Sequence, residues 1–172
     1  MKTLFLLRHC EAYQFEEEKS DHDKQLNGNG KKSAKLLNNW FYKNNVIIDH
    51  ILVSSAVRTL TTAHILFSNM KSKIHEKKEL YLCGYREILK ELSLLDNSLN
   101  NVIVIGHEPS ISETLKFLIS YCRPDLKYVT NSLYPTGGLA ILNFNIKSWY
   151  EIDEKTGVLD AFVTPNYLKK NE

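Results

Sequence analysis

An uninterrupted run of four β-branched residues at positions 102–105 (VIVI) constrains the fold of this chain more than any other feature. Such a run predicts a strand covered on both faces, because a strand with one face in water alternates apolar and polar residues. Other apolar runs predict strands at 3–7, 50–53, 139–144 and 158–163, and a short strand at 79–82. The covered run therefore requires helices on both sides of a sheet.

Apolar residues at helical spacing fill most of the intervals between these strands. The three clearest stripes lie at 34–41, 85–95 and 111–122. A further helix is predicted over residues 56–68, with Ser54 and Ser55 as candidate N-caps. The alternation of strands and helices predicts an α/β fold of three layers, in which a mostly parallel sheet carries helices on both faces.

Length and charge narrow the class of protein. A chain of 172 residues fits one domain, so we expect a single domain over 1–172 with a frayed tail at about 166–172. The net charge of +2 gives no general attraction for nucleic acid or an anionic membrane. No apolar run approaches the roughly 20 residues of a membrane span, and Arg8 interrupts the N-terminal run too early for a secretory signal. We therefore expect a cytoplasmic protein.

Charged and imidazole side chains follow three of the predicted strands. The first strand ends in Arg8 and His9, Arg58 comes about one helical turn after the second, and His107 directly follows the third. In open α/β sheets, ligands bind outside the carboxyl ends of the strands. The sequence therefore predicts that these two arginines and two histidines meet at one edge of the sheet.

This set of side chains indicates a phosphoryl site. The arginine fork matches phosphate oxygens, and the helices expected to begin near residue 55 and near Pro109 direct their positive ends to the same edge. Histidine can act as the nucleophile in covalent catalysis. No carboxylate–histidine cluster has the spacing of metal ligands, and the three cysteines are too widely spaced for a zinc site. We expect no metal and no cofactor.

Three segments of the chain resemble the histidine phosphatase superfamily, whose fold is that of phosphoglycerate mutase. They are LLRHCEA (6–12), SSAVRTLTTA (54–63) and VIVIGHEPSI (102–111), in the order that the family has them. Within the superfamily the chain is most similar to the short phosphohistidine phosphatases of the SixA type. The segments SDHDKQLNGNGKKSA (20–34) and PTGGLAILNF (135–144), with the later Trp149, support that branch.

The resemblance implies a role for each matching residue. His9 would be the nucleophile that becomes phosphorylated, and Arg8, Arg58 and His107 would bind and polarise the phosphoryl group. Lys24 stands where the SixA branch usually has arginine, which implies a substrate contact at the rim.

Two departures from the family pattern bear on the chemistry. Cys10 replaces the usual glycine or alanine beside the nucleophile, so we expect it either to narrow the pocket or to expose a thiol to oxidation. The longer members of the superfamily carry a dedicated acid between the second and third motifs. Here the candidates for that acid are Asp21, Glu79 and Glu108.

Taken together, the residues and the resemblance predict a metal-independent phosphatase that works through a phosphohistidine intermediate. We expect its substrate to be phosphohistidine on a protein, such as a phosphorelay domain, because a short chain leaves little sequence for a cap over the site. Two alternatives remain open. One is a small-molecule phosphomonoesterase of the same fold, and the other is a non-catalytic phosphate-binding adaptor. Nucleic acid and membrane are not expected as partners.

Several other features have simpler interpretations. The cysteine-phosphatase pattern Cys-x5-Arg is absent after Cys10, because Glu16 occupies the position of the arginine. The segment GNGKKS (28–33) lacks the P-loop pattern and is interpreted as a turn and helix start. The charge run at 15–24 is expected to be a mobile, solvated loop. Four histidines have no expected partners, namely His22, His50, His64 and His75.

Overall fold

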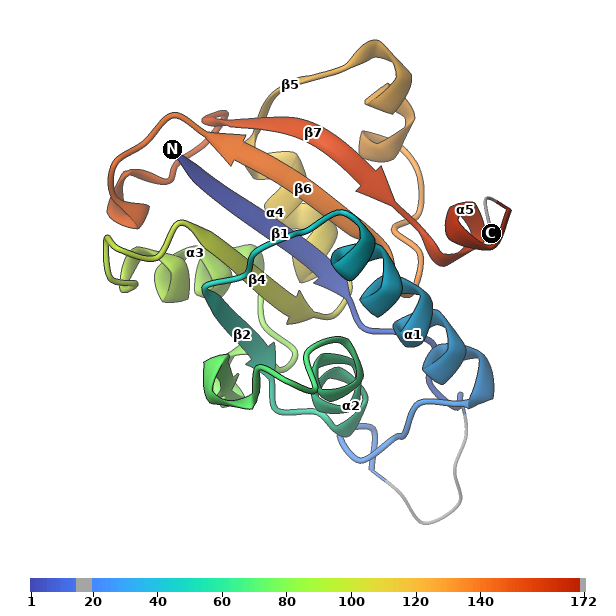
Figure 1. Cartoon of the computed structure of the whole chain (residues 1–172). Coiled ribbons are helices and arrows are strands. Elements are labelled where there is room, and N and C mark those ends of the chain that lie inside the picture. The colour runs from blue at the N-terminus through green and yellow to red at the C-terminus, as the bar shows by residue number, and fades with distance from the viewer. Residues whose placement is uncertain (15–19, 171–172) are drawn as a thin grey trace.

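The computed structural model, which describes residues 1–14 and 20–170, contains a seven-stranded sheet with the order β3-β2-β4-β1-β6-β7-β5 (Figure 1). The strands are β1 (Lys2–Arg8), β2 (His50–Ser54), β3 (Ile74–Lys77), β4 (Asn101–Gly106), β5 (Ile119–Cys122), β6 (Leu139–Phe144) and β7 (Gly157–Val163). In the described part of the chain, only β6 runs against the others, since it pairs antiparallel with both β1 and β7. The predicted α/β fold with a mostly parallel sheet is confirmed.

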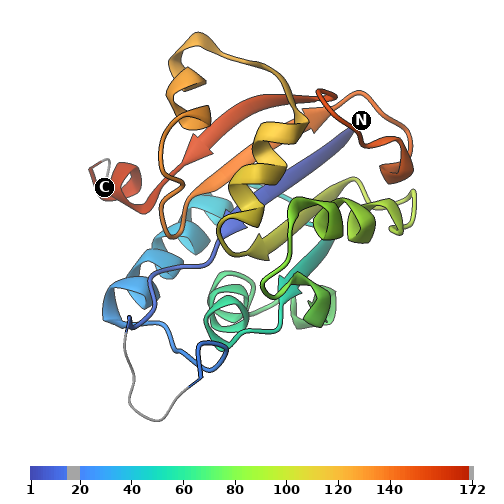
Figure 2. The same ribbon diagram turned by 180° about the vertical axis from the view of Figure 1, so that it is seen from behind.

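Helices cover both faces of the sheet. They are α1 (Gly28–Lys43), α2 (Val57–Leu66), α3 (Tyr85–Ser93), α4 (Ser110–Leu118) and α5 (Pro165–Lys170). Helices α1, α2 and α5 lie on the face seen in Figure 1, whereas α3 and α4 cover the opposite face, seen in Figure 2. Short 3-10 helices at Lys71–Lys73, Lys78–Leu80, Pro124–Thr130 and Trp149–Glu151 complete the connections. The tail that was expected to fray from about residue 166 is helical as far as Lys170.

The central strands separate two hydrophobic cores. Along β1, Leu4 and Leu6 pack beneath α3 and α4, whereas Phe5 and Leu7 pack beneath α1 and α2. All four side chains are buried, as the alternating geometry of a strand with two covered faces requires. Because β1 and β4 pair in parallel, the carboxyl ends of both strands lie at the same edge of the sheet. They are visible as neighbouring arrowheads in Figure 1.

The start of α1 is fixed to the loop that follows β1. The Asn27 side chain caps the helix by accepting a hydrogen bond of 2.8 Å from the Gly30 N–H. Gly30 lies so close to the loop that a Cβ there would come within 1.9 Å of the Glu11 carbonyl oxygen. The backbone of α1 thus touches the backbone of the segment that carries the first motif.

Two predictions about secondary structure are wrong. Residues 79–82 form no strand, because the chain pairs with β2 earlier, through the mostly polar residues of β3, and then turns into a 3-10 helix. The helix predicted over 111–122 ends at Leu118. Ile119 and Cys122 keep the apolar spacing because they pack against the same core from β5. Residues 15–19 of the predicted charged loop lie outside the described residues.

The predicted helix starts also need correction. Helix α2 begins at Val57 after Ala56, without a side-chain cap, because Ser54 and Ser55 form hydrogen bonds to histidines instead. Pro109 occupies the N-cap position of α4 and not its first helical position.

Candidate active site

The four residues that the strand ends were expected to deliver do lie together. Arg8 is the last residue of β1 and is paired in register with Gly106, the residue before His107. His9 follows directly, and its ring centroid lies 5.2 Å from that of His107. Arg58 extends from the first turn of α2 and lines the same cavity as Arg8 and His9.

His9 is held in a single tautomer by its own backbone. Its Nδ1 lies 2.7 Å from the Cys10 carbonyl oxygen, and a carbonyl oxygen can only accept, so Nδ1 carries the proton. In the neutral ring the lone pair is therefore on Nε2. The side chain is 9% exposed. Burial lowers the pKa of His9 to about 4, with the charges of Arg58 and Arg8 adding to the effect and the Cys10 carbonyl opposing it. At neutral pH the ring is thus neutral, with Nδ1 protonated and Nε2 unprotonated.

His107 is the more deeply buried of the two imidazoles. Its Nε2 shares a hydrogen bond of 2.7 Å with the Ser54 hydroxyl, whereas its Nδ1 is buried and has no partner. Burial lowers the pKa of His107 to about 3, and the neighbouring His9 and Arg58 lower it further. Where the Ser54 hydroxyl donates to Nε2, the neutral ring carries its proton on Nδ1 as a donor without a partner; in the other tautomer Nε2 donates to Ser54 and Nδ1 is an acceptor.

The two arginines differ in how they are held. Arg8 donates from Nη1 to the Tyr134 carbonyl oxygen at 2.6 Å, but its Nε is buried without a partner. Burial lowers the pKa of Arg8, and the nearby Glu108 carboxylate opposes this. Arg58 donates from Nη1 to the main-chain carbonyl of Asp21 and from Nη2 to its carboxylate at 3.0 Å.

Two side-chain nitrogens near His9, Arg8 Nε and His107 Nδ1, are buried without a hydrogen-bond partner, which favours the binding of an anion there. Leaving a buried donor unsatisfied costs about 1–3 kcal/mol, so native structures rarely keep one without a reason. In the described part of the chain, Arg8 Nε and His107 Nδ1 are the buried side-chain nitrogens in this state. Acceptor oxygens of a phosphoryl group beside His9 would satisfy Arg8 Nε, and they would satisfy His107 Nδ1 in the tautomer that carries its proton there. His107 is the neighbour of His9 but is not among the residues that line the cavity.

The cavity at the site has a volume of about 300 Å³ and a mixed polar rim. Besides Arg8, His9 and Arg58, its lining includes Lys24 and Asp21. Lys24 lines the cavity, and its Nζ forms an ion pair of 3.2 Å with Asp21. The size suits a phosphoryl group together with a small leaving group.

The three carboxylates considered as the acid occupy different surroundings. Asp21 lies at the site, where burial raises its pKa but hydrogen bonds from Arg58, Tyr81 and Lys24 outweigh this and lower it to about 2. Asp21 is therefore ionised at neutral pH and has no proton to donate. Glu108 accepts a hydrogen bond of 3.0 Å from the Ser112 N–H at the start of α4. Glu79 is exposed on the 3-10 helix after β3.

Cys10 does not behave as expected. The side chain is fully buried, so the thiol is not exposed to oxidation, and Cys10 is not among the residues that line the cavity. Its N–H donates to the Thr62 hydroxyl at 3.2 Å, and burial raises the pKa of the thiol to about 12. The structure thus assigns Cys10 to the core beneath the site and not to the pocket.

Three residues near the site were not identified from the sequence, namely Ser54 (as a partner of His107), Tyr81 and His22. The His22 ring is 3.0 Å from the Ser55 hydroxyl and packs edge-on against Tyr81. No local sequence signal marks these residues, because the contacts join segments that are far apart in the chain. Among the other histidines without an expected partner, His50 and His75 stack on each other at the start of β2 and on β3, with ring centroids 4.0 Å apart.

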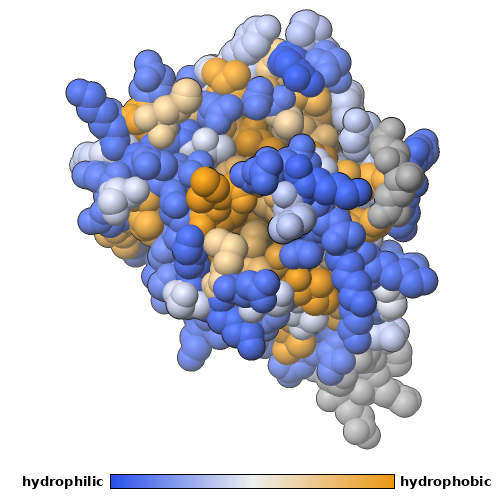
Figure 3. Space-filling model, in the orientation of Figure 1, coloured by the Kyte–Doolittle hydropathy of each residue, from blue (hydrophilic) through white to orange (hydrophobic). Residues whose placement is uncertain are grey.

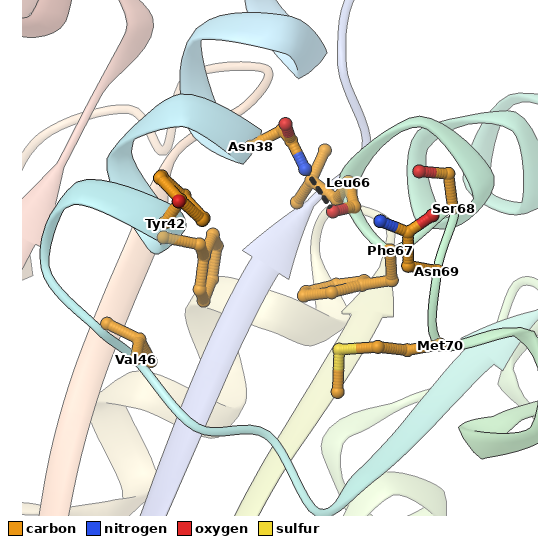
Figure 4. A pocket seen from close by; sticks show the side chains of 9 residues that line it. Asn38, Tyr42, Val46, Leu66, Phe67, Ser68, Asn69 and Met70 are labelled. Atoms are coloured by element: carbon orange, nitrogen blue, oxygen red, sulfur yellow. Dashed lines mark hydrogen bonds between the residues drawn. The ribbon is translucent and has the colours of Figure 1, made fainter.

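A second hollow, of about 190 Å³, lies between the C-terminal ends of α1 and α2 (Figure 4). Apolar side chains gather in the middle of this face of the molecule (Figure 3), and the hollow is lined by Phe41, Val46, Phe67 and Met70 among others. None of its described lining residues is charged. The hollow shares no lining residue with the cavity at His9, which lies at the opposite end of α2.

Comparison with known proteins agrees with this geometry. A family model described as histidine phosphatase superfamily (branch 1) matches residues 4–85. The match confirms the resemblance to the histidine phosphatase superfamily. A structure from Nakamurella multipartita, named for the phosphohistidine phosphatase SixA, has a TM-score of 0.80 and 25% identity, covering 95% of this chain and 96% of its own.

Two further structures share the histidine phosphatase fold. The protein histidine phosphatase SixA, in complex with tungstate, has a TM-score of 0.77 and 24% identity, with 96% of this chain and 99% of that chain covered. An Escherichia coli structure named for α-ribazole-5′-phosphate phosphatase has a TM-score of 0.68 and 18% identity, with 96% and 98% covered. At these identities the likeness concerns the fold alone. Among the described residues, no helix is long and apolar enough to cross a bilayer.

Proposed function

We propose that this protein is a metal-independent phosphatase whose substrate is phosphohistidine on a protein. In the proposed reaction the phosphoryl group passes to His9, and the phospho-His9 intermediate is then hydrolysed. The observation that carries the proposal is the pair of buried nitrogens without partners, Arg8 Nε and His107 Nδ1, beside an imidazole whose Nε2 is unprotonated. Arg8 and His107 would bind the anion, and His9 would be the nucleophile beside it.

In the first step of the proposed reaction, the lone pair of His9 Nε2 attacks phosphorus. The bond between phosphorus and the substrate nitrogen breaks, and the leaving imidazole takes a proton from solvent. Arg8, Arg58 and His107 donate hydrogen bonds to the phosphoryl oxygens, where charge collects in the transition state. Asp21 is ionised, so this mechanism assigns it no proton transfer.

In the second step, water attacks the phosphorus of phospho-His9. The bond from phosphorus to Nε2 breaks, the proton of the attacking water passes to solvent, and inorganic phosphate leaves. The hydrogen bond from Nδ1–H to the Cys10 carbonyl persists through both steps, which stabilises the ring while Nε2 carries the phosphoryl group. The cycle needs water as its only second substrate.

The preference for a protein substrate is supported by the connections around the cavity. The segment from β3 to α3 consists only of residues 78–84, so no cap domain is inserted there. A phosphorylated side chain can then approach a cavity of about 300 Å³ from solvent. The likeness to structures named SixA points in the same direction. As part of the proposal, residues 1–172 act as one catalytic domain in the cytoplasm.

The likeness to a structure named for α-ribazole-5′-phosphate phosphatase supports a second candidate, a small-molecule phosphomonoesterase. A phosphate-release assay separates the two. The wild type is given a phosphohistidine protein, p-nitrophenyl phosphate and a sugar phosphate, each with a chelator present. The variants are His9→Ala and, as a matched control, His64→Ala, which removes an exposed histidine of α2.

We expect release from the phosphohistidine protein that survives the chelator, disappears in His9→Ala and is unchanged in His64→Ala. A strong preference for the sugar phosphate would favour the small-molecule phosphatase. Release that persists in His9→Ala would show that His9 is not the nucleophile. If the wild type bound inorganic phosphate in calorimetry but turned over none of the three substrates, the adaptor interpretation would replace the enzyme.

A further inference from the structure

Asp21 is the meeting point of hydrogen bonds from three different segments. Its carboxylate accepts from Arg58 Nη2 at 3.0 Å and from the Tyr81 hydroxyl at 3.0 Å, and it pairs with Lys24 Nζ at 3.2 Å. Its main-chain carbonyl accepts from Arg58 Nη1. Both terminal nitrogens of the arginine therefore face Asp21.

The exposures of the two ion-pair partners are very unequal. The Arg58 side chain is 8% exposed, whereas the Asp21 side chain is 52% exposed. A half-exposed carboxylate can turn towards water unless something holds it, and an ion pair at the surface contributes little by itself. Tyr81 supplies the restraint from the other side, since its hydroxyl donates to the same oxygen, Oδ2, that accepts from Arg58.

Tyr81 is itself placed by the rings on either side of it. It lies in the segment between β3 and α3, and it packs edge-on against His22, with ring centroids 4.8 Å apart, and against His107, with centroids 5.7 Å apart. Tyr81 therefore contacts one member of the proposed phosphate shell directly and reaches another, Arg58, through Asp21.

We propose that Asp21 and Tyr81 are positioning residues, with Tyr81 fixing the Asp21 carboxylate so that Asp21 orients the Arg58 guanidinium towards the phosphoryl group. This inference rests on the proposed function, because it assigns a task to the same site. A guanidinium has five N–H donors in one plane. Asp21 takes one from each terminal nitrogen, which fixes the plane and leaves the remaining donors for a phosphoryl group. The ionised state of Asp21 strengthens the contact between its carboxylate and Arg58 Nη2.

A double-mutant cycle tests whether Tyr81 acts through Asp21. The variants are Tyr81→Phe, Asp21→Ala and the double variant, with Tyr150→Phe as the matched control, since Tyr150 is 81% exposed on a distant 3-10 helix. Two quantities are measured for each, namely kcat/KM with p-nitrophenyl phosphate and the Kd of inorganic phosphate in calorimetry. Circular dichroism and urea denaturation check that each variant folds.

We expect Tyr81→Phe to lower kcat/KM and to weaken phosphate binding by about fivefold each, which converts to about 1 kcal/mol. Asp21→Ala should lower both by roughly 30-fold or more, because the guanidinium loses its charge-assisted contact with the carboxylate and keeps only the main-chain carbonyl of residue 21 as a partner there. In the Asp21→Ala background, Tyr81→Phe should add less than about a twofold effect, since its route to Arg58 is already gone. Asp21→Asn, which keeps one acceptor oxygen, should recover part of the loss.

Two results would overturn the inference. One is an undiminished fivefold effect of Tyr81→Phe in the Asp21→Ala background, which would make the two residues independent. The other is tighter phosphate binding by Asp21→Ala, which would make the carboxylate a competitor for Arg58. Should Asp21→Ala not fold, the same cycle is run with Asp21→Asn. A wild type without turnover, combined with a coupled cycle in phosphate binding, would refute the proposed function and leave this inference intact.

Discussion

Activity at the His9 site should persist far below the pH at which histidines ordinarily protonate. Burial and the two neighbouring arginines lower the pKa of His9 to about 4. At pH 5, an ordinary histidine with a pKa of about 6.5 is neutral in about 3% of molecules, whereas one with a pKa of about 4 is neutral in about 90%. The buried site should therefore retain about 30 times more of the nucleophilic form at pH 5 than an exposed histidine would.

The assay is the pH profile of kcat/KM between pH 7.5 and 2.5, which reports ionisations of the free enzyme once that of the substrate is corrected for. p-Nitrophenyl phosphate is the substrate, and NMR titration of the histidine rings follows His9 directly, with its signal assigned by its loss in His9→Ala. Circular dichroism at each pH shows that the protein stays folded.

The expected acid limb has a midpoint near pH 4, with kcat/KM falling about tenfold per pH unit below it. A midpoint at pH 6 to 6.5, in the kinetic profile and in the titration of the ring alike, would refute the argument. It would mean that His9 is hydrated and that the surrounding charges do not act on it. A midpoint near pH 4 in the titration with no acid limb in the rate would instead remove His9 from the role of nucleophile.

Three further predictions concern stability, each measured by urea denaturation. The folded state keeps His9 and His107 neutral, so the free energy of unfolding should fall as the pH drops below about 6.5, the pKa of a histidine in the unfolded chain. The expected loss at pH 5 is about 2 kcal/mol for each histidine. A flat profile would contradict both pKa shifts. Tyr134→Phe should cost about 1–3 kcal/mol, because the buried hydroxyl bridges a carbonyl of β1 and an N–H of β6, and no loss would show that water replaces it. Gly30→Ala should cost about 1–3 kcal/mol through the clash with the Glu11 carbonyl, whereas Gly28→Ala, with open space around it, serves as the control.

Local sequence predicts those parts of the site that follow directly from strands. Arg8 ends β1, and His9 and His107 come immediately after β1 and β4. The parallel pairing of these strands brings their ends together without any further information. The buried VIVI run fixes β4 as a central strand, and that in turn requires helices on both faces. These inferences depend on periodicity and on one geometric rule, so they survive errors at the ends of individual elements.

The surroundings of those residues depend on contacts that periodicity does not encode. The serine that ends β2 is predicted from the sequence to be a helix cap, yet Ser54 forms a hydrogen bond to His107 because β2 and β4 are neighbours in the sheet. Tyr81 lies in a segment that resembles a short strand, and its value to the site depends on where the 3-10 helix places its hydroxyl. Such contacts are set by the packing of distant segments, so only coordinates reveal them.

Under the proposed function, the buried donors of the site and its more exposed residues have different tasks: the first bind the phosphoryl group, and the second select the substrate. Arg8 Nε and His107 Nδ1 are buried and without partners, and under the proposed function they would bind phosphoryl oxygens whatever group the phosphorus is attached to. Asp21 and Lys24 are at the rim, where the group attached to phosphorus must pass. The inner donors would therefore be shared by any phosphatase with this shell, and discrimination between a phosphohistidine protein and a small phosphoester must arise at the rim. Substitutions at Lys24 should accordingly change the ratio of kcat/KM between the two kinds of substrate more than they change the binding of inorganic phosphate.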